Sequence, residues 1–192
     1  MSTASPDSSA ERFGAVEATR LRLLDATVDA LSRFGERKLN MSAVASLAGV
    51  SRPTLYRYFP SKPELLNALA EHQQCRFDAG LAETLRGVGR EEQIDAVLRF
   101  VVRFQADDRT RRLVDIEPAW VLERLARMLP TQRASLARLL ADNVEHSEGA
   151  RPTRDPEEVA DLIVRTALSY FLIPGGDETQ LLRALRAVVR IV

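Results

Sequence analysis

Residues that begin and end helices between positions 39 and 50 limit the folds that this chain can adopt. Asn40 can accept hydrogen bonds from the free amides of a helix start, with Ser42 as the alternative cap. Leu39 and Val44 occupy the two positions of a hydrophobic staple around Asn40. Gly49 then ends the helix, so the spacing predicts one short helix.

A second short helix and the start of a longer one follow directly. Ser51 is placed to cap the second helix, and Pro60 stops it. Ser61 and Glu64 then form a capping box for a helix that we expect to run to about residue 86. Two short helices joined by a tight glycine turn indicate a helix-turn-helix, with small Ala45 at the helix crossing.

A longer helix precedes this unit. Apolar residues recur every three or four positions from about Glu17, and Gly35 is placed to end the helix in a left-handed cap. Residues 1–14 lack periodicity and are rich in Ser and Ala, so we expect a disordered arm there. The apolar stripe consists of Leu21, Leu24, Val28, Leu31 and Phe34.

The second short helix has an unusual outward composition. Leu55 and Phe59 lie four residues apart and are expected to face inward, which leaves basic and aromatic side chains outside. Arg52, at the N-terminal end, is placed to reach base edges, while Tyr56, Tyr58 and Lys62 suit phosphate oxygens. Thr54 suits a thymine methyl or a phosphate, and Arg57 shares the outward surface. The alternative is that both tyrosines pack on the scaffold and Lys62 is simply solvated.

Charge is distributed unevenly although the chain is neutral overall. Residues 20–62 contain eight basic and three acidic residues, a net charge of +5, so the remainder carries −5. A basic segment joined to an acidic remainder is typical of one module that binds nucleic-acid phosphates beside another that does not. Chance clustering of solvated charges is the alternative.

Residues 19–69 resemble the tetracycline-repressor (TetR) family of bacterial transcription regulators. The resemblance is carried by "RLLDATVDALSRFG" and "VASLAGVSRPTLYRYFPSKPELL". It implies an all-helical dimer with an N-terminal three-helix domain that binds a palindromic DNA operator and a C-terminal domain that binds a small molecule. By position it implies DNA contacts at Ser42, Arg52, Thr54, Tyr56, Tyr58 and Lys62. Ser42 departs from the family, whose members often carry an arginine or another longer polar residue there.

Helical patterns recur after residue 90, separated by "LPTQ", "GARPTRDP" and "IPGGDET". The segment 156–172 is apolar around much of its circumference, so we expect it to pair with its copy in a homodimer. With 178–191 it would form an intermolecular four-helix bundle, and burial within one chain is the alternative. The expected helices cover 94–104, 114–128, 132–146, 156–172 and 178–191.

Aromatic residues and one methionine in this C-terminal part are candidates for a ligand cavity, although such residues more often form plain core. Few charges fall on the inward faces of these helices, which favours an apolar or amphipathic small molecule. The candidate ligand-binding residues are Phe100, Phe104, Trp120, Met128, Tyr170 and Phe171.

The sequence therefore predicts an all-α protein: a disordered arm (1–14), a helix-turn-helix DNA-binding domain (15–62) and a helical regulatory and dimerisation domain (63–192). We expect a ligand-responsive repressor, with a helical protein-interaction module as the alternative. Two histidines, His72 and His146, and no phosphate loop or paired carboxylates give no basis for an enzyme, a cofactor or a metal. The single Cys75 and the absence of an apolar span or signal predict a cytoplasmic protein without membrane contact.

Overall fold

The computed structural model describes residues 7–104, 108–145, 155–173 and 177–190, and in these ranges the chain forms nine helices and no strand. This confirms the predicted all-α fold. The helices are α1 (Asp7–Lys38), α2 (Met41–Leu47), α3 (Arg52–Tyr58), α4 (Lys62–Leu85), α5 (Arg90–Phe104), α6 (Asp108–Ile116), α7 (Pro118–Glu145), α8 (Pro156–Leu172) and α9 (Glu178–Arg190).

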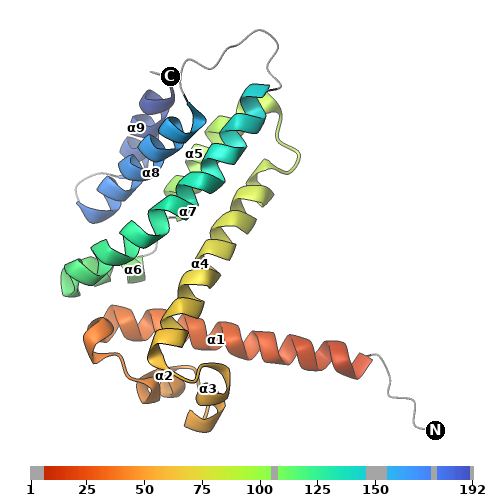
Figure 1. Cartoon of the computed structure of the whole chain (residues 1–192), viewed down its shortest axis with the longest axis vertical. Helices are drawn as coiled ribbons and strands as arrows, with labels where there is room; N and C mark the ends of the chain where they lie inside the picture. Colours follow the sequence, from red (N-terminus) through yellow and green to blue (C-terminus); the bar gives the residue numbers. More distant parts are fainter. Residues whose placement is uncertain (1–6, 105–107, 146–154, 174–176, 191–192) are drawn as a thin grey trace.

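The helices form two groups connected by α4. Helix α1 lies across one end of the molecule, with α2 and α3 beside it, and α4 runs from this unit towards the other helices (Figure 1). Helices α7 and α8 pack side by side in the second group, α9 lies against both α8 and α5, and α6 lies against α1. The small α2–α3 unit is therefore presented at one end of the molecule, away from α8 and α9.

The predicted helix-turn-helix is present, and its caps hold it in place. The Asn40 Oδ1 accepts a hydrogen bond from the Ala43 amide at 2.8 Å, so Asn40 rather than Ser42 caps α2. Gly49 has a φ of 65°, which lets the chain turn, and the Val50 amide donates to the Ala45 carbonyl at 3.0 Å. The turn is thus closed by backbone hydrogen bonds.

Serine caps start the next two helices, as predicted. The Ser51 Oγ accepts from the Thr54 amide at 3.2 Å and begins α3. The Ser61 Oγ accepts from the Glu64 amide at 3.3 Å and begins α4. The Glu64 carboxylate accepts from the Ser61 hydroxyl at 3.2 Å, which closes this cap through the side chains.

Both ends of α1 differ from the sequence-based prediction. The helix begins at Asp7, so residues 7–14 of the predicted disordered arm are helical, and residues 1–6 lie outside the described residues. At the other end Gly35 has φ 75° and ψ 171°, a conformation essentially restricted to glycine rather than the left-handed helical cap that we expected. A short helical turn resumes after it and reaches Lys38.

Hydrophobic side chains gather in two clusters, and α4 contributes to both. Leu65 and Leu69 belong to the cluster around α1, α2 and α3, whereas Phe77 and Leu81 belong to the cluster around α5, α7, α8 and α9. The first cluster also includes Leu113, Val121 and Phe171 from the C-terminal helices. The boundary that we proposed at residues 62 and 63 therefore does not separate two independent hydrophobic cores.

The C-terminal helices depart from the prediction at two places. Helix α6 was not predicted, and the expected break at "LPTQ" is absent because α7 continues through Pro130. Proline removes one helical hydrogen bond, but α7 packs along α8 on both sides of this position, and this packing outweighs the loss. The segment 156–172 is helical as predicted, whereas His146 and Ile191, at the ends of two predicted helices, lie outside the described residues.

No helix within the described ranges combines the length and apolar character that crossing a bilayer requires.

Candidate functional site

Helix α3 presents a polar, basic surface because its apolar side chains point inward. Leu55 is fully buried and Phe59 almost so, and both belong to the cluster around α1 and α2. Arg52, Tyr56 and Arg57 are exposed, with 41% of the Tyr56 side chain accessible. These three predicted contact residues therefore face outward, as the sequence pattern indicated.

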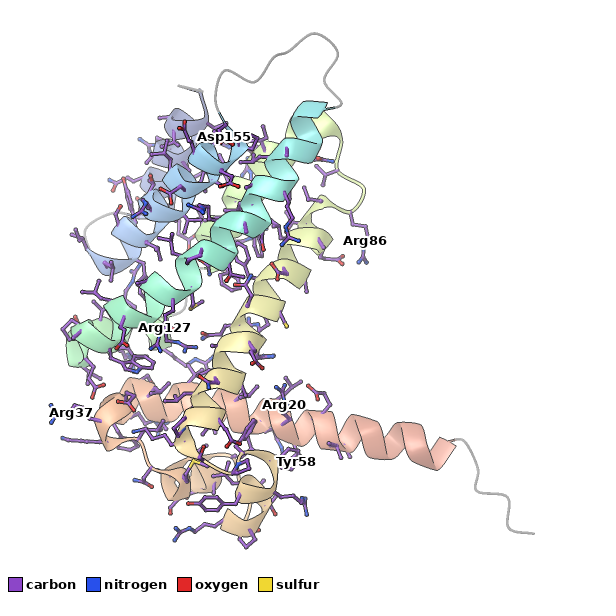
Figure 2. All side chains as sticks on the ribbon, viewed as in Figure 1. Arg20, Arg37, Tyr58, Arg86, Arg127 and Asp155 are labelled. Carbon is purple, nitrogen blue, oxygen red and sulfur yellow. The ribbon has the colours of Figure 1, made fainter. Side chains whose placement is uncertain are left out.

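The remaining predicted contacts on α2 and α3 are partly engaged within the protein. Tyr58 is half-buried against the core, with its ring centroid 6.5 Å from that of Phe59, and the Arg57 guanidinium lies 5.7 Å from the Tyr58 ring centroid. The Thr54 hydroxyl lies 2.8 Å from the Ser51 hydroxyl in the α3 cap. Ser42 is half-buried in the first turn of α2. Figure 2 shows Tyr58 at the end of the molecule where α2 and α3 lie.

Lys62 is held by α1, a contact that the sequence did not reveal. Its Nζ lies 2.8 Å from the Glu36 Oε1 and donates to the Glu36 carbonyl at 2.6 Å. An ammonium group has three donors, so one N–H remains for a phosphate. The structure thus gives Lys62 a role in connecting α1 to α4 besides its predicted contact.

All three acidic residues of the basic segment 20–62 take part in ion pairs. Arg109 on α6 lies 2.8 Å from the Asp25 carboxylate and 3.2 Å from the Asp29 carboxylate, while Glu36 pairs with Lys62. The two aspartates are therefore compensated by a residue outside the segment. Within the described residues, neither arginine of α3 forms an ion pair with a carboxylate.

The turn between α6 and α7 is bonded to the break in α1. The Glu117 carboxylate accepts hydrogen bonds from the Glu36 amide at 2.8 Å and from the Arg37 amide at 3.0 Å. It therefore caps the short helical turn that follows Gly35, where two amides lack helical partners. Through this contact and Arg109, α6 is attached to α1 at both of its ends.

A partly open cavity of about 160 Å³ lies between the two groups of helices. Four of the six predicted ligand-binding residues line it: Phe104, Trp120, Met128 and Phe171. The other two lie elsewhere. Phe100 is buried beside the cavity, with its ring centroid 5.4 Å from that of Phe77, and Tyr170 packs against the second hydrophobic cluster.

Polar residues also line the cavity, and sequence analysis missed them. They include two arginines, although we had expected few charges on the inward faces. Arg124 lies four residues after Trp120 and four before Met128, so helical spacing from those two candidates could have identified it. The polar lining residues are Gln73, Arg76, Thr110, Arg124 and Gln132.

Arg124 is the half-buried cation of the cavity wall. Its Nη2 donates to the Gln73 Oε1 at 3.2 Å, and its guanidinium carbon lies 5.6 Å from the Trp120 ring centroid. Loss of hydration on burial, followed by the nearby positive charge of Arg127, lowers the pKa of Arg124 below its ordinary value. The side chain stays charged, because the ordinary pKa of arginine is far above neutral.

The geometry of α2 and α3 defines the class of the protein, a helix-turn-helix DNA-binding protein. Residues 23–69 match the family model for bacterial regulatory proteins of the tetR family. The match spans α1 from Leu23, both short helices and the first part of α4. The N-terminal helix-turn-helix region of this chain is therefore similar to that of the tetR family of bacterial regulatory proteins.

Named relatives agree with this assignment. The chain is 38% identical over 94 residues to the HTH-type transcriptional repressor LfrR of Mycolicibacterium smegmatis, covering 49% of this chain and 47% of that protein. It is 47% identical over 60 residues to the HTH-type transcriptional repressor KstR of Mycobacterium tuberculosis, covering 31% of this chain and 27% of that protein. The chain thus matches about half or less of the length of these relatives.

The fold is similar to solved structures over nearly its whole length. The fatty acid degradation regulator FadR from Bacillus halodurans superposes with a TM-score of 0.70 at 17% identity, covering 97% of this chain and 96% of that chain. At this identity the likeness concerns the fold alone.

Proposed function

We propose that this protein is a ligand-responsive transcriptional repressor that binds a palindromic operator as a homodimer. The observation that carries the proposal is the outward surface of α3. Arg52, Tyr56 and Arg57 are exposed there on a helix that two caps and a buried leucine hold in place. This combination suits insertion into the major groove of DNA.

Each predicted contact has a role in that complex. Arg52, in the first turn of α3, reads a base edge, since arginine to guanine is the commonest specific contact. Tyr56, Tyr58 and the free donor of Lys62 contact phosphates and set the register of the protein on DNA. Ser42, Thr54 and Arg57 add further polar contacts at the edges of the same surface.

The homodimer is proposed to form through α8 and α9. Helix α8 buries one face inside the chain, while Leu162 on its other side is 38% exposed and Ile173, just after its end, is 72% exposed. These apolar groups favour packing against a second copy in an isologous interface. Such a dimer would place two α3 helices about 34 Å apart, in successive major grooves.

The cavity offers a route from a ligand to the DNA-binding helices. Val28 and Leu31 of α1 line it directly, as does Leu69 of α4. A molecule bound there would contact both helices that carry the helix-turn-helix. Binding that favours a different position of α1 or α4 changes the spacing between the two α3 helices and releases the operator.

Selection of random duplex DNA by the purified protein, followed by sequencing of the bound pool, tests the proposal. An enriched palindrome supports it. No enrichment over input DNA, from a protein that is folded and dimeric, contradicts operator binding by the ligand-free protein.

Three variants test the assignment of α3. Arg52→Ala is expected to weaken binding to the selected site by about 10–100-fold and to relax preference at one base pair, because one base contact is lost. Tyr56→Phe is expected to weaken binding by roughly 2–10-fold on all sequences, because a phosphate donor is lost. The matched control is Arg86→Ala, since Arg86 is exposed at the opposite end of α4 from α3 (Figure 2). Equal affinities for all three variants would contradict the assignment.

Salt dependence separates this proposal from a protein-interaction module. Each phosphate contact releases bound counterions, so the logarithm of the affinity should fall with the logarithm of salt by about 0.9 per contact. With several contacts per recognition helix, the affinity would drop steeply as salt is raised. A partner held through an apolar protein interface would show a nearly flat dependence.

A further inference from the structure

Arg124 is the half-buried cation in the wall of a largely apolar cavity, whose other lining arginine, Arg76, is exposed, and no carboxylate of the described residues pairs with Arg124. Among the described residues that line the cavity there is no aspartate or glutamate. Arg124 donates a hydrogen bond to the neutral Gln73 amide oxygen and makes a cation–π contact with the Trp120 ring. These two contacts balance its positive charge only partly. A partly desolvated charge of this kind is stabilised most by an anion.

A second arginine raises the positive potential at the same place. Arg127 follows on α7 and repels the charge of Arg124. The only carboxylate within ion-pair distance of Arg127 in the described structure is Glu123 at 3.6 Å, and both side chains of that pair are about two-thirds exposed. Because Arg127 is about two-thirds exposed, solvent screens both this pair and the repulsion of Arg124, so Arg127 adds only a small positive potential there. Figure 2 shows Arg127 on α7, on the part of that helix nearest α1.

The position of Arg124 suits a ligand with two unlike ends. Arg124, Trp120 and Met128 line both the partly open cavity and an outer groove of about 680 Å³. They therefore form the boundary between an apolar interior and a more polar exterior. The groove also contains Glu36, which Lys62 neutralises, and Glu71, which is exposed and makes no ion pair with either arginine in the described structure.

The cavity volume limits the apolar end of the ligand. A cavity of about 160 Å³ is close to the size that holds a single benzene ring. Phe104, Phe171 and Leu136 around it offer contacts to an apolar ring or a short alkyl chain, not to a second charged group. The polar end must then lie at Arg124, next to the groove.

We propose that the cavity binds a small amphipathic anion whose apolar ring or short alkyl chain fills the interior and whose carboxylate or equivalent anionic group pairs with Arg124. This rests on the proposed function in taking the cavity as the regulatory site, and it names the chemical class of the ligand. Neutral and cationic molecules of the same shape are rejected, because they leave the desolvated guanidinium uncompensated.

The experiment uses the full chain and two matched sets of probes. One set is phenylacetate, phenylacetamide and phenethylamine, and the other is octanoate, octanamide and octylamine. Trp120 is the sole tryptophan of the sequence and lines the cavity, so its fluorescence reports occupancy directly. We expect the acid to bind at least about 10-fold more tightly than the amide and the amine in whichever set fits the cavity.

Two variants locate the charge recognition. In Arg124→Gln the acid should bind about 10–100-fold more weakly and lose its advantage over the amide. Glutamine can still donate to Gln73, so the contact between α7 and α4 has a substitute. The matched control Arg127→Gln, which changes a groove residue outside the cavity lining, should alter the affinity by less than about 3-fold. Thermal unfolding of each variant verifies that it is folded, and Arg124→Met, which also removes the charge, replaces Arg124→Gln if the latter is not.

Three results would overturn the proposal: an amide or amine that binds as tightly as its acid, an acid preference that persists in Arg124→Gln, or no fluorescence or stability change with any probe up to about 10 mM. These binding measurements use no DNA, so they test the ligand class separately from the proposed DNA-binding function. A protein that selects a palindrome but prefers amines loses only the ligand class. A protein that binds the acids but selects no DNA loses only the proposed function.

Discussion

Replacing Gly35 by alanine tests the contact between the DNA-binding helices and the C-terminal helices. The new Cβ would lie 2.6 Å from the Glu117 Oε1, 2.9 Å from its Cδ and 3.1 Å from the Ile116 Cγ2. Cβ atoms are essentially never found within 3.0 Å of another heavy atom, so the Glu117 carboxylate must move. The backbone at φ 75° and ψ 171° is also strained for any residue with a Cβ.

The magnitude follows from two separate effects. Strain at a backbone conformation restricted to glycine costs about 1–3 kcal/mol. Displacing the Glu117 carboxylate from the Glu36 and Arg37 amides costs about 1–3 kcal/mol more, since both hydrogen bonds involve a charged acceptor at a half-exposed site. The free energy of unfolding should therefore fall by about 2–6 kcal/mol, and the melting temperature by on the order of 10 °C.

Urea unfolding followed by circular dichroism, at one protein concentration, measures the effect. The matched control is Gly49→Ala, because Gly49 also has a positive φ, 65°, but nothing lies within 4 Å of an added Cβ. That variant should lose only the backbone contribution, about 1–2 kcal/mol. The double variant Gly35→Ala with Glu117→Ala should lose less than the sum of the two single changes, since the clash is gone. Equal losses for the two glycine variants, with additive effects at Glu117, would refute the reasoning.

Two further changes test residues of α4 that interact with α1. Lys62→Met should lower the free energy of unfolding by about 1 kcal/mol, because it removes the two bonds from Lys62 to Glu36; urea unfolding equal to wild type would contradict this. His72 has a pKa lowered mainly by burial and then by the charges of Arg76 and Arg20, so the folded state favours the neutral ring. The contribution of His72 to the free energy of unfolding is therefore fully present above the ordinary pKa of 6.5. It is lost as the pH falls from there through the lowered pKa of the folded state. His72→Gln should remove this part of the pH dependence of the urea midpoint, and an unchanged profile would exclude it.

Local chemistry made the helix-turn-helix predictable from sequence. Asn40, Ser51 and Ser61 cap helices through contacts to amides three residues ahead, and Gly49 supplies a backbone conformation that few other residues adopt. Interactions of this range depend on neighbours in sequence alone. The outward face of α3 followed from the same reasoning, because burial of Leu55 fixes which side chains face outward.

Long-range contacts explain what the sequence did not predict. Helix α6 is attached to α1 by Arg109 and by Glu117 at its end, across about 80 positions of sequence, and no local signal reports such contacts. The break expected at Pro130 was wrong because packing of α7 on α8 outweighs the lost hydrogen bond. Arg124 is different, since its spacing from Trp120 and Met128 was visible in the sequence and was overlooked.

The hydrophobic cluster that joins α1, α2 and α3 to Leu113, Val121 and Phe171 has a consequence for building hybrid regulators. A hybrid that joins residues 1–62 to the C-terminal part of another regulator would cut through this cluster and leave unmatched apolar surfaces on both pieces. The operator preference proposed for α3 should be transferable by changing its exposed residues alone, since they contribute nothing to the cluster. Exchange of whole domains must also carry the matching surfaces of α4, α6 and α7. In this chain, the residues proposed to read the DNA sequence are therefore easier to exchange than the whole domain that carries them.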